Sequence, residues 1–347
     1  MKKIIPILVL SMFIFSCFVQ KKITNKQSNI QKETTDFTIA FGSGNNQKKD
    51  NLFWQDILDN NADVWIWGGD NIYCDTADMQ VLEKCYSKQK NKPAYQNFIK
   101  NIDVIGMWDD HDYGLNDGGN EYEQKAASQQ LFLDFLDVPK VDKRRIRKGT
   151  YSSQTYEING QKVKIIILDT RYFRTSLTKD TETRKRYKPN VQGDGTMLGN
   201  AQWKWLENEL TNSDADYNII NSSIQFLSNK HGFEAWGNMP HEVEKMEELI
   251  IKTNAKGVFI LSGDRHISEI SMKEIGKNKF KLYDFTSSGL THAYTKFKEE
   301  ENPYRVSKVV HQKSYGLVKF NFKQKKITFE MWGEDKELLE TQTITLK

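Results

Sequence analysis

An apolar run ends abruptly in a glycine pair and a carboxylate at Asp63-Val-Trp-Ile-Trp67-Gly68-Gly69-Asp70-Asn71-Ile72-Tyr73. Continuous apolar runs of this length are typical of strands that are buried on both faces of a sheet. Glycines at the end of such a strand let the backbone and a ligand approach each other closely. We therefore expect a buried strand over 63–67 that presents Asp70 and Tyr73 at its carboxyl end.

The same pattern, an apolar run followed by polar residues, recurs at 37–41, 104–108, 163–168, 217–220 and 257–261. Helical patterns lie between several of these runs, at 52–58, 126–136, 201–210 and 242–251. Strands that alternate with helices predict an α/β fold with much parallel sheet, in which ligands bind beyond the carboxyl ends of the strands.

The tail of the chain has a different pattern. Apolar and polar residues alternate at 317–322 and 327–332 around a polar turn. This alternation predicts a C-terminal antiparallel hairpin near the sheet edge, followed by a last strand around 341–346.

The polar residues at the strand ends are those that bind cations. A carboxylate and a phenolate, at Asp70 and Tyr73, suit a hard cation. The cluster Asp109-Asp110-His111-Asp112 costs free energy through like-charge repulsion unless cations neutralise it. Asp264 and His266 lie two residues apart, so in an extended segment they would point to one side and ligate neighbouring metals. The alternatives are a turn Asp with a buried Tyr, a solvated acidic turn, and a surface turn with a structural His.

Arg171 follows Asp169 by two residues at the end of another apolar run. A guanidinium matches phosphate oxygens well, and it matches carboxylates equally well. A contact with a phosphate ester and a structural ion pair therefore both stay open for Arg171.

The N-terminus resembles a bacterial lipoprotein signal peptide over residues 1–17. Lys2 and Lys3 precede a short apolar run, and Ile14-Phe15-Ser16-Cys17 resembles a lipobox in which Cys17 is acylated. An ordinary secretory signal is the alternative. Residues 18–36 are polar and predict a flexible tether to a folded domain at 37–347. We expect a protein of the bacterial cell envelope, lipid-anchored to the membrane on the periplasmic or cell-surface face.

The cysteines and the net charge bear on disulfide pairing and on the partners of the protein. Cys74 and Cys85 would lie in an oxidising compartment, where they either pair or stay free. The formal net charge of the 347-residue chain is +4, from 50 Lys and Arg against 46 Asp and Glu. This small, scattered excess argues against a nucleic-acid partner. The oligomeric state stays open.

The segments GGDNIY, WDDHDYG, LDTRYFR, TMLGNAQWKWLE and LSGDRH, in this order, resemble the PhoD-like alkaline phosphatase branch of the calcineurin-like metallophosphoesterase superfamily. The resemblance runs from about residue 37 to about residue 320. It implies a four-layer α-β-β-α sandwich of two sheets flanked by helices. It also implies two metal ions, iron and calcium or other divalent ions such as manganese, magnesium or zinc, and hydrolysis of phosphomonoesters or phosphodiesters.

The resemblance assigns roles motif by motif. Asp70 is similar to the carboxylate that bridges both metals, and Tyr73 resembles the metal-binding tyrosine. Asp110 stands where the superfamily has a metal-binding Asn, and His111 matches the His that assists the leaving group. The closing pair of ligands, one to each metal, aligns with Asp264 and His266.

Two departures from the family pattern affect the expected metal ligands. The first block usually reads GSCN, with the Cys as a metal ligand, whereas this chain has Gly42-Ser43-Gly44-Asn45. The fourth block normally supplies a His, but none occurs after the apolar run 217–220. The side chains that would fill the two places are Asn45 or Cys74 for the first, and Asn221, Ser222 or Gln225 for the second.

These observations predict a phosphoric ester hydrolase of the alkaline phosphatase or phosphodiesterase type. A hydroxide bridging two metals would attack phosphorus, His111 would protonate the departing alkoxide, and Arg171 would neutralise a phosphate oxygen. One alternative is a phosphodiesterase for phospholipids or cell-wall polymers. The other is a surface lipoprotein that binds phosphate esters with lost or altered turnover.

Overall fold

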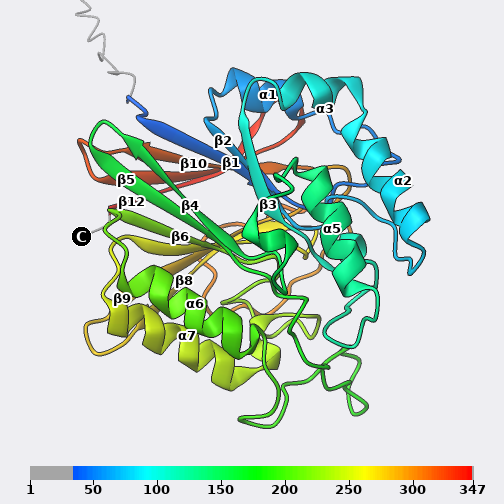
Figure 1. Ribbon diagram of the computed structural model, residues 1–347. Helices are drawn as coiled ribbons and strands as arrows, with labels where there is room; N and C mark the ends of the chain where they lie inside the picture. The colour runs from blue at the N-terminus through cyan, green and yellow to red at the C-terminus, as the bar shows by residue number, and fades with distance from the viewer. Residues whose placement is uncertain (1–33, 346–347) are drawn as a thin grey trace, which may run out of the picture. The chain divides into compact units, whose positions relative to one another are not determined.

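Two six-stranded sheets pack face to face in the part of the chain that the computed structural model describes, residues 34–345 (Figure 1). The first sheet has the order β12-β11-β10-β1-β2-β3, and its strands span Leu338–Thr345, Lys326–Trp332, Tyr315–Asn321, Phe37–Gly42, Val64–Gly68 and Asp103–Met107. The second has the order β4-β5-β6-β7-β9-β8, and its strands span Ser152–Ile158, Gln161–Ile167, Tyr217–Asn221, Val258–Ser262, Phe280–Ser287 and Ser268–Ile275. Parallel pairing joins β1, β2 and β3, and it also joins β5, β6, β7 and β9.

Helices cover the outer face of each sheet (Figure 1). Over the first sheet lie α1, α2, α3 and α5, which span Trp54–Asp59, Met79–Lys90, Pro93–Phe98 and Lys125–Phe135. Over the second lie α6 and α7, which span Gly199–Thr211 and Pro240–Thr253. Shorter helical segments are α4, η1, η2 and η3, at Asp110–Tyr113, Lys143–Arg145, Trp236–Asn238 and Glu334–Lys336.

The residues of β2 show why its apolar run is continuous. Val64 and Ile66 belong to the core between the two sheets. Trp65 and Trp67 belong to the core between the first sheet and its helices, where both rings pack against Trp54 of α1. Successive side chains of a strand point to opposite faces, so a strand between two cores needs apolar residues at every position. The expected four-layer α-β-β-α sandwich is confirmed.

The predicted elements are present with small shifts at their ends. The expected helices correspond to α1, α5, α6 and α7, and the C-terminal hairpin is the antiparallel pair of β10 and β11. The last strand, β12, lies beside β11 at the edge of the first sheet. The sequence patterns did not predict β4, β8, β9, α2 or α3, and β4 has mixed burial with no clean apolar face.

Glycines allow the strand ends of the two sheets to meet. A Cβ atom on Gly263, after β7, would lie 2.6 Å from the hydroxyl oxygen of Ser43 and 2.8 Å from the carbonyl oxygen of Gly68. Any side chain at position 263 would therefore push the second sheet away from the first. This close approach brings the polar segments after β1, β2 and β7 to one place.

The structure also decides the pairing of the two central cysteines. Cys74, after β2, and Cys85, in α2, form a disulfide with a Cα–Cα distance of 6.3 Å. In residues 34–345 no helix has the length and apolarity that crossing a bilayer requires. The expected signal peptide and Cys17 lie outside the described residues, and β1 begins at Phe37.

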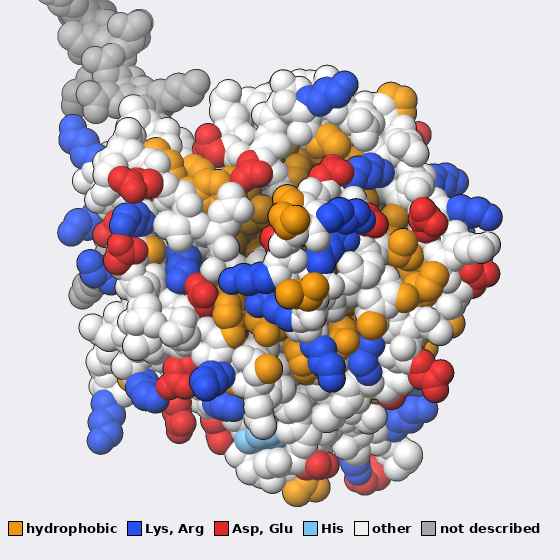
Figure 2. Space-filling model, viewed as in Figure 1, with side chains coloured by type: hydrophobic (Ala, Val, Ile, Leu, Met, Phe, Trp, Pro, Cys, Tyr) orange, Lys and Arg blue, Asp and Glu red, His pale blue; other side chains and the backbone are white. Residues whose placement is uncertain are grey.

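Charged side chains of both signs are mixed on the face shown in Figure 2. Hydrophobic side chains are visible among them, and the most exposed in the described residues are Val141 and Ile146, at 95% and 92%. This mixture agrees with the small net charge of +4.

Candidate metal centre

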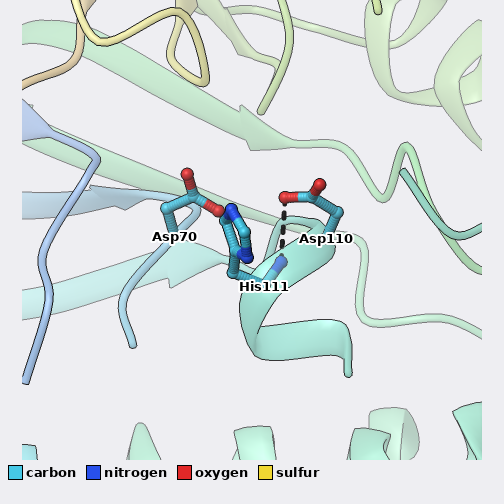
Figure 3. A group of neighbouring side chains, drawn as sticks. All are labelled: Asp70, Asp110 and His111. Atoms are coloured by element: carbon cyan, nitrogen blue, oxygen red, sulfur yellow. Dashed lines mark hydrogen bonds between the residues drawn. The ribbon is translucent and has the colours of Figure 1, made fainter. Parts of the chain in front are cut away.

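Four carboxylates from three separate segments meet at the carboxyl ends of the strands. Asp70 follows β2, Asp109 and Asp110 lie at the start of α4 after β3, and Asp264 follows β7. One oxygen of each lies within 4.8 Å of the others. Figure 3 shows the carboxylate groups of Asp70 and Asp110 close together, beside His111. Asp70, Asp110 and Asp264 line a pocket of about 390 Å³ together with His266 and residues of several loops.

Left-handed backbone conformations set the direction of three side chains of the site. Asp70, Asp264 and His266 have φ angles of 50°, 67° and 52°. Each such angle costs about 1–2 kcal/mol for a residue other than glycine, and such strain gathers at functional sites. Asp264 and His266 do line one pocket, as expected. The predicted extended conformation was wrong, because the segment that carries Asp264 and His266 is a tight turn.

The Tyr73 side of the centre joins a phenol, a carboxylate and an imidazole. The Tyr73 hydroxyl donates to Oδ2 of Asp70 at 2.9 Å and lies 2.7 Å from Nε2 of His266. That Nε2 atom is 3.7 Å from Oδ2 of Asp70. Burial, and then the charge of Asp70, raise the pKa of Tyr73 well above its usual range, so the phenol ionises only beside a cation.

The Asp110 side is acidic and held by hydrogen bonds. Oδ2 of Asp110 accepts from the backbone N–H of Asp117 at 2.7 Å and from Nδ2 of Asn116 at 2.9 Å. Burial opposes the charge on Asp110, but Arg171, His111 and these contacts outweigh it and bring its pKa to about 2. Asp110 therefore stays ionised.

Among the other acids, Asp109 is paired with Arg171, whereas burial disfavours the charge on Asp70 and Asp264. Burial, and then the charge of Asp110, raise the pKa of Asp70 to about 7. Burial also raises the pKa values of Asp109 and Asp264 well above their usual range. Within residues 34–345, Oδ1 of Asp70 and Oδ2 of Asp109 are buried without a hydrogen-bond partner. Unpartnered carboxylate oxygens this close together fit divalent cations, which prefer oxygen ligands.

His111 differs from the other histidines of the site because it is held in its charged form. Its Nδ1 atom lies 2.8 Å from a carboxylate oxygen of Asp75. Burial opposes the imidazolium charge, but Asp75, Asp70 and Asp110 outweigh it and raise the pKa of His111 to about 10. Burial, and then a neighbouring His, instead lower the pKa values of His266 and His292 to about 4.

Arg171 is placed as a structural ion pair. Its side chain is 0% exposed, and its guanidinium lies 2.5 Å from Oδ1 of Asp109 and 2.6 Å from Glu234. Arg171 does not line the pocket, so the expected contact with a phosphate is wrong. The structural ion pair, which the sequence left open for Arg171, is the arrangement in the fold. Arg186 and Arg265 line the pocket instead, and the side chain of Arg186 is 49% exposed.

The amide side chains that were expected to fill the two missing ligand places make other contacts. Asn45 donates to Gln89 at 2.9 Å and accepts from Asn51 at 3.2 Å, so both of its side-chain atoms are occupied. Gln225 donates to side chains of β8 and β9, at Glu269 and Thr286. Asn221 is fully buried, and its side-chain atoms have no hydrogen-bond partner in the described part of the chain, whereas the Ser222 hydroxyl donates to a backbone carbonyl. The structure therefore does not bring Asn45 or Gln225 to the carboxylates.

The sequence analysis gave no individual role to several residues that the fold brings to the site, namely Asp75, Asp109, Asp117, Arg186, Glu234 and His292. Asp109 belongs to the acidic cluster at the end of β3, so its position did carry a signal. Asp75 lies two residues after Tyr73. The others lie on loops whose meeting depends on the whole fold.

The fold and this site together define a metallophosphoesterase-like protein. The chain belongs to the PhoD-like phosphatase family, whose sequence profile matches residues 39–331. Alkaline phosphatase D of Bacillus subtilis (strain 168) is 24% identical over 215 residues, a match that covers 54% of this chain and 36% of that protein. The chain thus spans about a third of the length of this relative.

Solved structures share the fold at low sequence identity. The structure of PhoD has a TM-score of 0.71 at 17% identity, covering 90% of this chain and 69% of that one. GAP50, the anchor in the inner membrane complex of Plasmodium, has a TM-score of 0.55 at 11% identity, covering 90% of each chain. A dimetal phosphatase from Danio rerio has a TM-score of 0.50 at 12% identity, covering 90% of this chain and 100% of that one. These likenesses support the fold alone.

Proposed function

We propose that the chain hydrolyses phosphate esters with two divalent cations held among these carboxylates. The observation that carries the proposal is the set of four carboxylates within 4.8 Å. Three of them, Asp70, Asp110 and Asp264, line a pocket that also holds His111 and two arginines. Within residues 34–345, Asp70 and Asp109 each have a buried oxygen without a hydrogen-bond partner. A buried group of acids without cations would be destabilising. Membership of the PhoD-like phosphatase family supports the same reaction.

The ligands divide between two cations. Asp70 lies between the two groups and would contact both. Tyr73 and His266 would hold the first cation, and Asp110 and Asp264 the second. When bound, the cations would supply Lewis acidity, which activates water and neutralises phosphate oxygens.

His111 would act as the general acid. It lines the pocket, and without bound cations the carboxylates around it raise its pKa to about 10, which favours the protonated ring. It would donate that proton to the departing ester oxygen, while the hydrogen bond to Asp75 keeps the ring in place.

Arg186 would contact the phosphate or the rest of the substrate. Its guanidinium is half exposed at the pocket and lies 2.7 Å from Asp117, which orients it. Arg265, which also lines the pocket, forms an ion pair with Glu300 at 3.0 Å. A cationic rim of this kind attracts the dianion of a monoester and the monoanion of a diester.

The test is the Asp70→Asn variant, assayed with p-nitrophenyl phosphate and bis-p-nitrophenyl phosphate. We expect turnover to fall by on the order of a thousandfold, because the ligand shared by both cations is lost. Asparagine tolerates the left-handed conformation at position 70, so the fold should stay intact. Asp103→Asn, at the amino end of β3, is the control and should keep activity. Near-wild-type turnover of Asp70→Asn would refute the proposal.

We also propose that the chain is anchored to the cell envelope through an acylated Cys17. The signal-peptide pattern of residues 1–17 supports this. Cys17→Ser should move the protein from the membrane fraction to the soluble fraction. Unchanged membrane retention of Cys17→Ser would contradict lipid anchoring.

A further inference from the structure

The loop after β9 is fixed against the segment that follows β1. The backbone N–H of Leu290 donates to the carbonyl oxygen of Ser43 at 3.1 Å, and that of Thr291 donates to the carbonyl oxygen of Gly44 at 3.1 Å. The next residue is His292. It is therefore held beside Gly44, the position at which the family pattern has a cysteine ligand.

The ring of His292 contacts two expected ligands. Its centroid lies 4.5 Å from that of His266 and 4.9 Å from that of Tyr73, with both pairs arranged edge to face. These are the residues that would hold the first cation. His292 is half-buried and comes from a different loop than either of them.

Thr291 orients the imidazole of His292. The Thr291 hydroxyl lies 3.1 Å from the carbonyl oxygen of Gly44 and 3.1 Å from Nδ1 of His292. When it donates its single proton to Gly44, it accepts a hydrogen bond from Nδ1–H of His292. This assignment leaves the lone pair on Nε2, which has no hydrogen-bond partner within residues 34–345. A His that donates from one ring nitrogen and offers the other is the usual arrangement of a metal ligand.

The other candidates for the missing ligand are excluded by their contacts. Cys74 is in a disulfide with Cys85. Both side-chain atoms of Asn45 are occupied by hydrogen bonds. Gly44 has φ of 75°, and a Cβ atom there would lie 3.2 Å from a backbone nitrogen, so the site is shaped around the glycine.

We propose that Nε2 of His292 completes the first cation site, in place of the thiolate that Gly44 lacks. This rests on the proposed function. The first site would then have two imidazoles, a phenolate and a shared carboxylate, whereas the second has carboxylates only. Imidazole suits zinc and iron, and carboxylates suit calcium, magnesium and manganese, so the two sites should differ in the metal they prefer.

The experiment is equilibrium dialysis of the chelator-treated full chain against zinc, with elemental analysis, for wild type and His292→Phe. Phenylalanine keeps a ring for packing against Tyr73 and His266 but has no nitrogen. We expect wild type to bind two zinc ions, and His292→Phe to bind one of them at least tenfold more weakly. Losing an outer partner of a ligand already costs about 10–100-fold in affinity, and a direct ligand should cost no less. His311→Phe, at an exposed position, is the control and should match wild type.

His292→Ala provides a second variant if phenylalanine disturbs the fold, which circular dichroism would detect. Two zinc ions bound by His292→Phe or His292→Ala with wild-type affinity would overturn the inference and leave the proposed function standing. Failure of wild type to bind two ions when dialysed against zinc, or against zinc and manganese together, would instead overturn the proposed function, and the inference with it.

Discussion

At the scale of single residues, the metal centre combines backbone strain with unbalanced charge. Asp70, Asp264 and His266 hold left-handed φ angles, and the buried carboxylate of Asp70 lies close to the half-buried carboxylate of Asp264. Neither feature stabilises the folded chain on its own. Both are accounted for if the site is built to bind cations, because ligand binding offsets the strain and the repulsion.

Asp75 should set the pH range of catalysis through His111. The carboxylate of Asp75 is among the groups that raise the pKa of His111 to about 10. A general acid is lost as pH rises through its pKa, so the alkaline limb of the kcat profile should follow His111. In Asp75→Asn the charge is gone, and we expect this limb to shift to lower pH by about one unit or more.

The kcat profile against pH, measured with p-nitrophenyl phosphate, checks this expectation. Asp50→Asn removes a carboxylate whose side chain is 91% exposed and serves as the control. An alkaline limb at the same pH in Asp75→Asn and in wild type would show that Asp75 does not act through His111.

At the scale of elements, the disulfide ties the segment after β2 to α2. Cys74 lies between Tyr73 and Asp75, so the bond restrains the backbone that carries a proposed ligand and the partner of His111. Closing a loop with a sequence separation of 11 residues stabilises a fold by about 3 kcal/mol, mainly by restricting the unfolded chain.

Cys85→Ser should therefore lower the melting temperature, and a reductant should lower that of wild type to a similar value. Differential scanning calorimetry with and without reductant measures both effects. The reductant should change Cys85→Ser little, because its central disulfide is already absent. Equal melting temperatures for wild type and Cys85→Ser under oxidising conditions would contradict the stabilising role.

The elements also show what the sequence could and could not predict. The strand ends at Asp70 and Asp264 were predictable, because the apolar run and the polar turn are neighbours in the chain. The partner of Arg171 was not, since Glu234 is 63 residues away and reaches it only through the fold. His292 was missed for the same reason, because its place beside Gly44 depends on the pairing of loops from two sheets.

At the scale of the whole molecule, the charge of the centre should make the stability of the metal-free protein depend on pH. Burial raises the pKa of Asp70 from 3.8 to about 7, and it also raises those of Asp109 and Asp264 well above their usual range. Such acids bind protons on folding, so they oppose folding increasingly as pH rises from 3.8 through the folded pKa values. The chelator-treated protein should melt at a lower temperature near about pH 8 than near about pH 6.

Added cations should reverse this trend, because they bind the ionised carboxylates. At a hundred times the dissociation constant, one bound cation stabilises the fold by about 2.7 kcal/mol. We expect the rise in melting temperature on adding manganese or zinc to be larger near about pH 8 than near about pH 6. Asp70→Asn, which lacks one of the acids, should show less of both effects. A rise that is the same at both pH values would contradict the assignment of these carboxylates as ligands.

The central claim is a hydrolase with two cations, and a metal titration of activity tests it most directly. Chelator-treated protein would receive zinc or manganese in known equivalents, and hydrolysis of bis-p-nitrophenyl phosphate would be measured after each addition. We expect no turnover without cations and a rise that ends at two equivalents per chain. Full turnover without added cations, or a plateau at one equivalent, would contradict it.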